Sequence, residues 1–532
     1  MIHRLDPARD GGPGGMPGAI RCSHWKSHGS QERRSETLPC RLSGRGVYSP
    51  PFAHLNEEDR MRQTRREFLK TTALATGATS IAGFPLVARA QASKVVVWWN
   101  KGYYPEEDAA MQKIVKEFEN RAKVEVDLSF TAQEDLLKKI NAALIAHRVP
   151  DVAFCFFNDW QVVPKYGWTG QLADCSDIVS DLKPRYNEKM LAVAHVLNSK
   201  TKKRAYYGVP IEAQTMHIHY WRDMLREVGM ADAPDRIPMK WDAYWGYWKK
   251  AQDELRKKDA AKYGKLYGIG MTESTRASDT LYNFDMALLS YHGEVIDAEG
   301  KVVADQAKNK KAITETLKWF GELFTSGYVP PDATNWTDGD NNAGFHSRLI
   351  VMTPNPSQSI PAAQFFNKED PEKKNYFDNM ATIEWPDGPD GKKARYLSAV
   401  KTIIIPAESK NQKAAKDFIK FVVERERFSE YIKAANGRWF PTFKDVADDP
   451  FWRTGHKGPK GQKDLHVPVA TTIFLDRENK VFDHWKHPAF SQVYDENVWG
   501  KAMARIAIDK WTADKAADEG IERVKAIFTH FK

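Results

Sequence analysis

The sequence predicts an α/β fold in which a mostly parallel sheet is flanked by helices. Three observations support this class: an apolar run that ends abruptly at residue 100, two stretches with helical spacing of apolar residues, and a strand-like run after each of them. Strand, helix, strand, helix and strand follow one another within about sixty residues, which favours parallel strands joined by right-handed crossovers.

The first elements are expected in this order: strand 95–99, helix 106–121, strand 124–130, helix 133–147 and strand 152–157. The first helix has apolar residues three and four positions apart from Met111 to Phe118, which is the spacing of one helix face. The second strand alternates apolar and polar residues from Val124 to Phe130, as a half-buried strand does. Pro150 is expected to end the second helix.

Length and charge limit the classes of function. The chain has 532 residues, which is enough for two or more domains. Its net charge is +9, but residues 1–92 hold 14 Lys and Arg against 8 Asp and Glu, so the remainder carries only +3. A net charge so close to neutral over residues 93–532 does not indicate nucleic-acid binding. No GxGxxG, P-loop, nucleophile elbow or HExxH motif occurs after residue 92.

The first 92 residues divide into two segments that precede the predicted fold. Residues 1–60 are rich in Gly, Pro, Arg and Ser without periodicity, so we expect a non-native or disordered extension. Residues 61–92 have the features of a twin-arginine signal peptide: Arg65-Arg66, then Phe68-Leu69-Lys70, a mildly apolar stretch, and Ala88-Arg89-Ala90 as a cleavage site. We therefore predict export to the periplasm by the twin-arginine route.

Two residue pairs and one stripe invite more specific interpretations. Cys155 and Cys175 could form a disulfide in an oxidising compartment, or remain buried free thiols, and their spacing does not decide between the two. His217 and His219 share one strand face, but no third ligand is spaced nearby, so we expect no metal site and no cofactor. The aromatic stripe over 241–248 has helical spacing and is expected to pack in the core.

Polar and aromatic residues gather where the first and third strands end. Ligands bind beyond the carboxyl ends of the strands in parallel sheets, so these two ends are expected to face one crevice. Trp98 and Trp99 alternate, so one is expected in the core and the other towards the crevice. Rings stack on the apolar faces of sugars, and amides and carboxylates bind hydroxyls, so we predict a small polar ligand such as a sugar. The residues are Asn100, Tyr103 and Tyr104 after the first strand, and Asn158, Asp159 and Trp160 after the third.

Several short motifs occur in a fixed order along residues 93–532. They are Trp-x-Asn at the end of the first strand, Val149-Pro150-Asp151-Val152, Tyr207-Gly208-Val209-Pro210, His219-Tyr220-Trp221-Arg222-Asp223, Gly327-Tyr328-Val329-Pro330 and Ser409-Lys410-Asn411. Each motif alone has little specificity. Their order and spacing together resemble the extracellular solute-binding protein family 1, the maltose-binding-protein-like receptors of ABC sugar importers.

The resemblance implies the two-lobed periplasmic binding protein type II fold. Each lobe would be a mostly parallel sheet flanked by helices, and the chain would cross between the lobes at three hinge segments, near 208–212, 349–354 and 398–401. Lobe 1 would then comprise 93–209 plus 352–398. Lobe 2 would comprise 211–349 plus 400–532.

The predicted ligand contacts combine the strand ends with positions that the resemblance favours. It supports binding at the strand ends and adds Glu212, which lies at the first expected crossing. It also favours two rings of one helix. An amide that follows the second expected crossing and a ring that precedes Pro441 are further candidates from their positions in the sequence. The full predicted set is Trp99, Asn100, Tyr103, Tyr104, Asn158, Asp159, Trp160, Glu212, Tyr282, Phe284, Asn355 and Trp439.

The resemblance implies a receptor without catalytic residues. It would act as a monomer, capture a carbohydrate between two closing lobes and deliver it to an inner-membrane ABC permease. Two alternatives stay open. The same fold could bind a polyol, a sugar acid, a glycerol phosphate, a peptide or a polyamine. Alternatively, the chain could be a secreted glycoside-active enzyme, which would show two facing carboxylates, one of them with a raised pKa.

Overall fold

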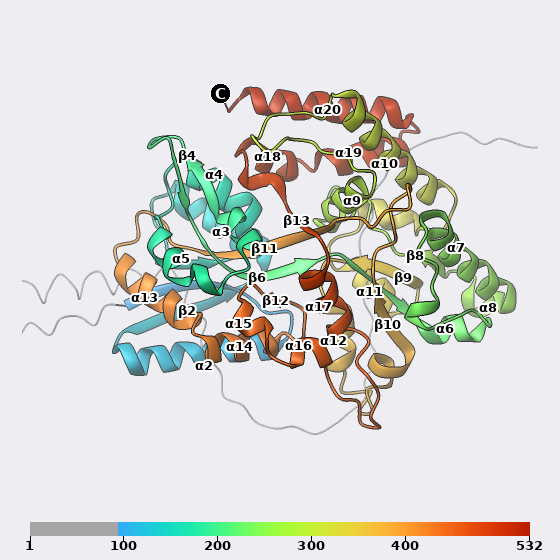
Figure 1. Ribbon diagram of the computed structural model, residues 1–532, viewed down its shortest axis with the longest axis horizontal. Coiled ribbons are helices and arrows are strands. Elements are labelled where there is room, and N and C mark those ends of the chain that lie inside the picture. Colours follow the sequence, from blue (N-terminus) through green and yellow to red (C-terminus); the bar gives the residue numbers. More distant parts are fainter. Residues whose placement is uncertain (1–93, 532) are drawn as a thin grey trace, which may run out of the picture. The chain divides into compact units, whose positions relative to one another are not determined.

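The computed structural model describes residues 94–531, whose strands form two main sheets and a hairpin (Figure 1). The first sheet has seven strands in the order β12-β6-β11-β3-β1-β2, with β13 also paired to β11. The second sheet has four strands in the order β10-β7-β9-β8, and β4 and β5 form the hairpin. The strands are β1 (Lys94–Asn100), β2 (Glu125–Thr131), β3 (Val152–Phe154), β4 (His195–Asn198), β5 (Lys203–Tyr206), β6 (Val209–Thr215), β7 (His217–Trp221), β8 (Tyr267–Ile269), β9 (Ile350–Asn355), β10 (Met380–Ile383), β11 (Tyr396–Ile404), β12 (Phe440–Pro441) and β13 (Asn479–Val481).

The first sheet begins as the sequence predicts. β1 pairs in parallel with β2 on one side and with β3 on the other, so that Val97 lies opposite both Leu128 and Val152. The helices α2 (Pro105–Ala122) and α3 (Gln133–Ile145) make the two connections. The predicted order of parallel strands and crossover helices is therefore confirmed.

The chain passes from the first sheet directly into the second at the end of β6. β6 belongs to the first sheet and continues through Met216 into β7 of the second sheet. β11 lies antiparallel to β6 over most of its length, with a register irregularity after Lys401. Figure 1 shows β6 and β11 side by side.

The strand pairing contradicts part of the expected division into lobes. β9 pairs with β7 and β8, and β10 pairs with β7, so the segment 352–398 contributes strands to the second sheet and not to the sheet of β1. β12 and most of β6, which were expected in lobe 2, belong instead to the sheet of β1. All six residues of β9 are buried. A run buried on both faces has no alternation, so its sequence does not indicate which sheet it joins.

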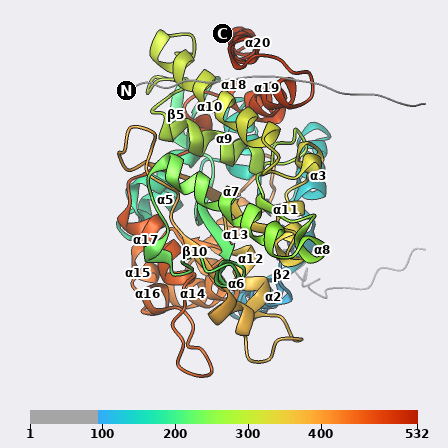
Figure 2. The same cartoon turned by 90° about the vertical axis from the view of Figure 1, so that its right-hand side faces the viewer.

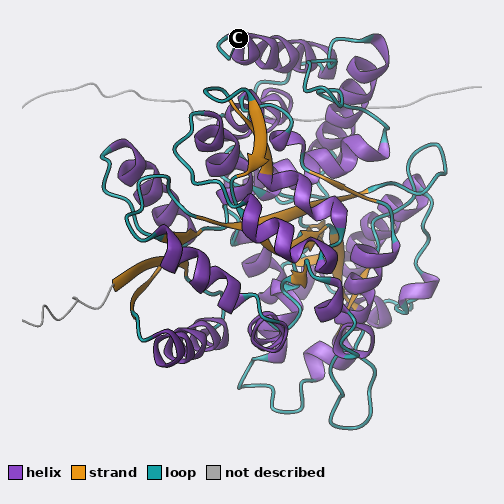
Figure 3. Cartoon of the chain, turned by 60° about the vertical axis from the view of Figure 1, so that its left-hand side comes forward, coloured by secondary structure: helices purple, strands orange, loops and turns teal. Residues whose placement is uncertain are grey.

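Helices enclose the strands, as Figure 3 shows. The remaining α-helices are α4 (Val163–Trp168), α5 (Ser176–Leu182), α6 (Arg222–Glu227), α7 (Trp241–Lys258), α8 (Ala260–Tyr263), α9 (Asp279–Ser290), α10 (Ala307–Thr325), α11 (Asp340–His346), α12 (Ser359–Phe365), α13 (Gln412–Val422), α14 (Arg425–Ala434), α15 (Lys444–Ala447), α16 (Phe451–Thr454), α17 (Val467–Asp476), α18 (Ala489–Asp495), α19 (Val498–Ala507) and α20 (Ala513–Thr529). The last two lie side by side and pack on α10 (Figure 2). Within residues 94–531, no helix has the length and apolar character needed to cross a membrane.

The aromatic stripe of α7 is core, as expected. All four of its rings are buried, and Trp245 packs against Trp319 and Trp385 with ring centroids 4.8 and 5.3 Å away. Cys155 and Cys175 are both buried free thiols, and burial raises the pKa of each to about 12. The second interpretation of the cysteines is therefore confirmed.

The predicted extension, residues 1–60, and the predicted twin-arginine signal, residues 61–92, lie outside the described residues. Both stay predictions.

Candidate functional site

A cavity of about 220 Å³ lies at the strand ends of both sheets. Part of its lining comes from elements of the first sheet and is called here the first wall: Tyr103, Gln133, Glu134, Phe156, Gln214 and Arg438. The rest comes from elements around the second sheet and is called the second wall: Ser278, Asp279, Thr337, Asp338, Gly339, Asn342, Asn355, Pro356, Ser357 and Ser359. Amide and hydroxyl groups predominate, which suits a polar ligand.

The loop between β1 and α2 brings Tyr103 to the cavity. The loop ends where Pro105 and an acidic first turn start α2, and the Glu107 carboxylate accepts hydrogen bonds from the backbone N–H groups of Tyr103 and Tyr104. Tyr103 is 47% exposed, whereas Tyr104 is buried and donates from its hydroxyl to the Ser359 carbonyl oxygen at 2.5 Å. This last bond joins the first-sheet loop directly to the second wall.

Arg438 is the positively charged group of the lining. Its Nη1 donates to both carboxylate oxygens of Glu107 at 3.1 Å, and the Trp439 indole donates to the same carboxylate at 3.1 Å. Arg438 and Glu107 are both more than nine-tenths buried. The guanidinium charge is therefore already balanced within the first wall.

The second wall has a network of amides and hydroxyls at the end of β9. Asn355 donates to Asn342 Oδ1 at 2.9 Å, and its own Oδ1 accepts from the Ser357 backbone N–H and hydroxyl at 2.8 and 3.1 Å. Asn342 in turn donates to the Ser359 hydroxyl at 3.1 Å. These groups fix one another, which holds donors and acceptors in place for ligand hydroxyls.

Two neighbouring carboxyls complete the second wall. Asp338 accepts from the Ser278 hydroxyl at 2.5 Å and from the Asp279 backbone N–H at 3.0 Å. Burial raises the pKa of Asp279 well above its usual value, and the charge of Asp338 adds to the effect. Burial also raises the pKa of Asp338, and the negative charge of Glu134 on the first wall acts in the same direction. Acids of the two walls therefore line the same cavity.

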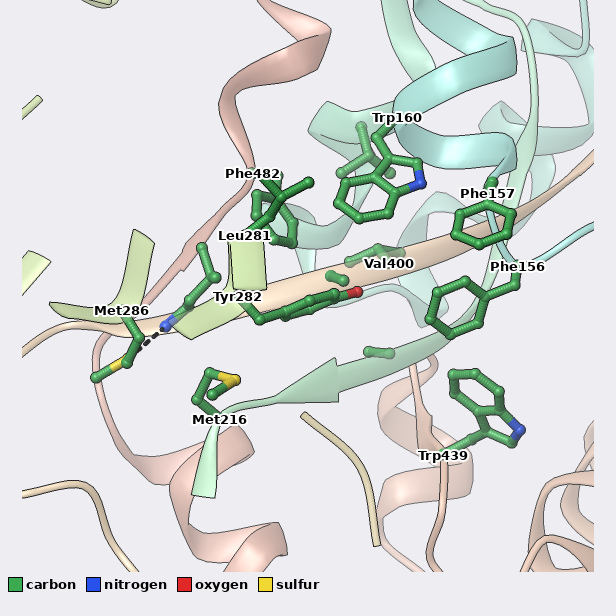
Figure 4. Close-up of a cluster of buried hydrophobic side chains, with 14 of the residues drawn as sticks. Phe156, Phe157, Trp160, Met216, Leu281, Tyr282, Met286, Val400, Trp439 and Phe482 are labelled. Atoms are coloured by element: carbon green, nitrogen blue, oxygen red, sulfur yellow. Dashed lines mark hydrogen bonds between the residues drawn. The ribbon is translucent and has the colours of Figure 1, made fainter. Parts of the chain in front are cut away.

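A buried ion pair lies under Phe156. The Lys401 ammonium is 3.4 Å from Asp159 Oδ1 and 3.2 Å from the Tyr282 hydroxyl, and it lies 3.9 Å from the centre of the Phe156 ring. Burial raises the pKa of Asp159 to about 6, although the charge of Lys401 opposes the shift. Figure 4 shows Tyr282 and Trp160 in the surrounding cluster of buried rings.

Glu212 lies in a second buried polar group on β6. It is fully enclosed and accepts from the Tyr431 hydroxyl at 2.7 Å, and that hydroxyl accepts from the Trp99 indole at 3.3 Å. Burial raises the pKa of Glu212 to about 8. The carboxyl is thus protonated over much of the neutral range.

Of the predicted ligand contacts, Tyr103 and Asn355 line the cavity. The others are buried and have partners within the protein. Asn158 donates to the carbonyl oxygens of Ala153 and Thr402, and Phe284 stacks on Trp499. The predicted residues that do not line the cavity are Trp99, Asn100, Tyr104, Asn158, Asp159, Trp160, Glu212, Tyr282, Phe284 and Trp439.

Sequence reasoning missed most of the lining. Gln133 and Glu134 follow β2, and the strand-end rule that was applied to β1 and β3 would have found them if extended to this strand. Asp279, Asp338 and Asn342 come from loops and helix starts of the second half, where nothing in the sequence marks them. A larger hollow of about 410 Å³ lies elsewhere, between α19 and α20. It is lined largely by residues of these two helices, some of them ion-paired, and no strand end contributes to it.

Comparison with known proteins identifies the class. The family described as bacterial extracellular solute-binding protein matches residues 113–459, and the chain belongs to this family. A binding protein of Brucella abortus is 25% identical over 271 residues, which are 50% of this chain and 56% of that protein. The chain thus spans little more than half the length of this curated relative. The diacetylchitobiose-binding protein DasA of Streptomyces coelicolor is 25% identical over 64% of this chain and 72% of its own length.

Solved structures of binding proteins share the fold. An ABC transporter solute-binding protein of Thermotoga lettingae, bound with α-D-tagatose, superposes with a TM-score of 0.64 at 18% identity, over 82% of this chain and 99% of its own. Maltose-bound MalE3 of T. maritima gives 0.62 at 18% identity, over 82% and 100%. The predicted two-lobed α/β fold and the predicted family are confirmed.

Proposed function

We propose that this protein is an exported receptor that captures a carbohydrate in the cavity between its two walls and delivers it to an ABC import permease. The observation that carries the proposal is the lining itself. It combines fixed amides and hydroxyls with two aromatic side chains, Tyr103 and Phe156, and it draws them from both sheets. Sugars need such a mixture, because their ring faces are apolar and their edges form hydrogen bonds.

The two walls give the proposed mechanism. A ligand that touches Gln214 and Phe156 on the first wall and Asn342 and Asn355 on the second stabilises the arrangement in which both walls meet it. β6 and β11 are the strands about which such a closure would turn. A permease that recognises the closed arrangement would then distinguish loaded from empty receptor. We propose that the receptor acts as a monomer in the periplasm.

The direct test is a thermal-shift panel of sugars, polyols, sugar acids and polyamines, combined with mass spectrometry of any ligand that co-purifies with the native protein. Carbohydrates should raise the melting temperature, because a ligand bound only by the folded state stabilises it. A panel in which only linear polyamines stabilise the protein would contradict the carbohydrate proposal. N-terminal sequencing of periplasmic material should begin near Gln91 or Ser93.

A second candidate function has a specific observation in its favour. Glu134 and Asp338 belong to opposite walls, and the pKa of Asp338 is raised, as in an acid and base pair of a glycoside hydrolase. The family and the structural relatives are described as binding proteins, so we place this candidate second. Long incubation with a stabilising oligosaccharide should leave it intact. Turnover that Glu134→Gln abolishes would favour the enzyme.

A further inference from the structure

The charges that line the cavity are not balanced. Glu134 lies on the first wall and Asp279 and Asp338 on the second, and none of the three forms a salt bridge with any residue of 94–531. Arg438, the lining cation, is occupied by Glu107. Lys401 lies beneath Phe156 and is occupied by Asp159. The lining therefore offers three carboxyls to a ligand and, among its residues, no cation that is free to pair with them.

The arrangement of these acids leaves room for a partner. Asp279 is only 7% exposed and lines the cavity, yet among the described residues it accepts one side-chain hydrogen bond, from Asn341 to Oδ2 at 3.1 Å. Its other oxygen, Oδ1, has no partner within residues 94–531. Asp338 lies beside it, and Glu134 lines the same cavity from the opposite wall. Like charges that face one another repel, unless a cation lies between them.

We propose that the ligand carries a protonated amine, which the cavity holds between Glu134 of the first wall and the Asp279–Asp338 pair of the second. This inference rests on the proposed function, because it names the kind of carbohydrate: one in which an amine stands among the hydroxyls, as in an amino sugar. The amides of Asn342 and Asn355 then bind the hydroxyls, and Tyr103 offers an exposed ring. Ligands with a carboxylate or phosphate are rejected by the same acids.

The amine also explains how binding can drive closure. In the empty protein, Glu134 opposes the approach of Asp338, because both are acids. An ammonium group between them replaces this repulsion by two attractions. A positively charged ligand therefore stabilises the closed arrangement more than a neutral one does. A neutral sugar of the same shape forms the hydrogen bonds but leaves the repulsion in place.

The test is calorimetric titration of the full chain at pH 7 with matched probes. The probes are D-glucosamine against D-glucose, and the disaccharide of glucosamine against its N,N′-diacetylated form. D-glucuronate, spermidine and calcium chloride complete the set. The free amine should bind at least tenfold more tightly than its hydroxyl or acetylated counterpart, and glucuronate should bind most weakly of the sugars.

Variants separate charge from shape. Glu134→Gln should weaken binding of the aminated probe about tenfold and leave the neutral sugar within twofold, so that the preference disappears. Asp135→Asn is the matched control, because Asp135 is an exposed acid of the same helix turn that pairs with Lys138 and does not line the cavity. It should change neither affinity by more than twofold.

The pH dependence gives an independent readout. The groups that face the amine are Glu134, Asp279 and Asp338, with Arg438 paired to Glu107 nearby. Since burial raises the pKa values of Asp279 and Asp338, affinity for glucosamine should increase with pH as these acids lose protons, for as long as the amine keeps its own proton, while affinity for glucose stays level.

The outcomes distinguish this inference from the proposed function. Equal affinity for aminated and neutral sugars, or tightest binding of glucuronate, would contradict the proposed amine site. Neither result would contradict the proposed function as a carbohydrate receptor. Stabilisation by calcium alone at the same acids would also overturn it. If spermidine binds and none of the sugars does, the amine site is supported and the proposed carbohydrate ligand is contradicted.

Discussion

Single buried ionisable side chains have effects on stability that can be measured without knowing the ligand. Glu212 keeps its proton in the folded protein up to about pH 8, whereas the unfolded chain loses it near pH 4.5. Between these values the unfolded state binds fewer protons, so the contribution of Glu212 to the free energy of unfolding falls by up to about 1.4 kcal/mol per pH unit as pH rises.

Glu212→Gln removes this penalty. The free energy of unfolding of the variant, relative to the native protein, should therefore increase steadily from pH 5 to pH 8. Urea unfolding at pH 5, 6.5 and 8 measures the difference. Glu430→Gln serves as the control, because Glu430 is an exposed partner of Lys113, and its difference should stay constant. A constant difference for Glu212→Gln as well would show that the carboxyl is ionised in the fold.

Lys401 and Asp159 form the other buried charge group, and both side chains are fully enclosed. Lys401→Met leaves Asp159 buried without its counter-ion and should lower the free energy of unfolding by about 3–5 kcal/mol. The double variant Lys401→Met with Asp159→Asn should recover part of this loss, because no charge remains to be buried. Urea unfolding of the three proteins at pH 7 tests the pair. If the change in the free energy of unfolding of the double variant equals the sum of the changes in the two single variants, Lys401 and Asp159 are not directly coupled.

At this scale the sequence predicts the edge of the sheet but not the direction of each side chain. Tyr103 lies on the loop beyond β1 and reaches the cavity, whereas Asn100 ends the strand and donates to the Lys101 carbonyl oxygen. Asn158 and Asp159 follow β3 as predicted, but a π-helical turn over Asn158–Val162 directs both into the interior. The turn contacts β11, where Asn158 donates to the Thr402 carbonyl oxygen, and no local pattern in the sequence indicates this partner.

At the scale of elements, one close approach between a helix and a strand is open to test. A Cβ atom added at Gly268 of β8 would collide with the backbone oxygen of Trp248 on α7, which is a fixed atom. Gly268→Ala should therefore force α7 away from the sheet and cost about 1–3 kcal/mol of stability. Thermal or urea unfolding measures the loss.

Gly246 on the same helix is the matched control. An added Cβ there meets nothing within 4 Å, so Gly246→Ala should be neutral or should stabilise the protein by up to about 1 kcal/mol through helix propensity. Equal destabilisation by both substitutions would show that the contact at Gly268 is not the cause.

Local patterns predict elements well where one face is buried. The helix spacing of Met111 to Phe118 and the stripe of α7 both indicate the buried face correctly. They fail for β9, whose residues are all buried and whose sheet is decided by pairing with β7, more than a hundred residues earlier. The chain was also expected to cross between the lobes near 349–354. These residues instead belong to β9 of the second sheet, for the same reason.

At the scale of the whole molecule, the bond from the Tyr104 hydroxyl to the Ser359 carbonyl oxygen joins the two walls. Tyr104→Phe removes it and should destabilise the arrangement in which the walls meet by about 1 kcal/mol, which weakens ligand affinity roughly fivefold, mainly through faster dissociation. Surface plasmon resonance with a stabilising sugar measures both rates.

Tyr247→Phe is the control for this bond. Its hydroxyl donates to the Ala231 carbonyl oxygen within the second half of the chain, so its loss removes the same kind of bond without separating the walls. Affinity should stay within twofold of the native protein. If both variants weaken binding alike, the effect of Tyr104 is one of general stability and not of the contact between walls.

The position of β11 also dictates the order in which the chain can fold. This strand fills the place between β6 and β3, yet it is synthesised nearly two hundred residues after β6. The sheet of β1 therefore cannot be completed before Ile404 has been synthesised. Until Ile404 has emerged, the edges of β3 and β6 that pair with β11 are unpaired, and unpaired strand edges favour aggregation. Folding that depends on so late a segment suits the predicted twin-arginine route, on which the protein crosses the membrane already folded.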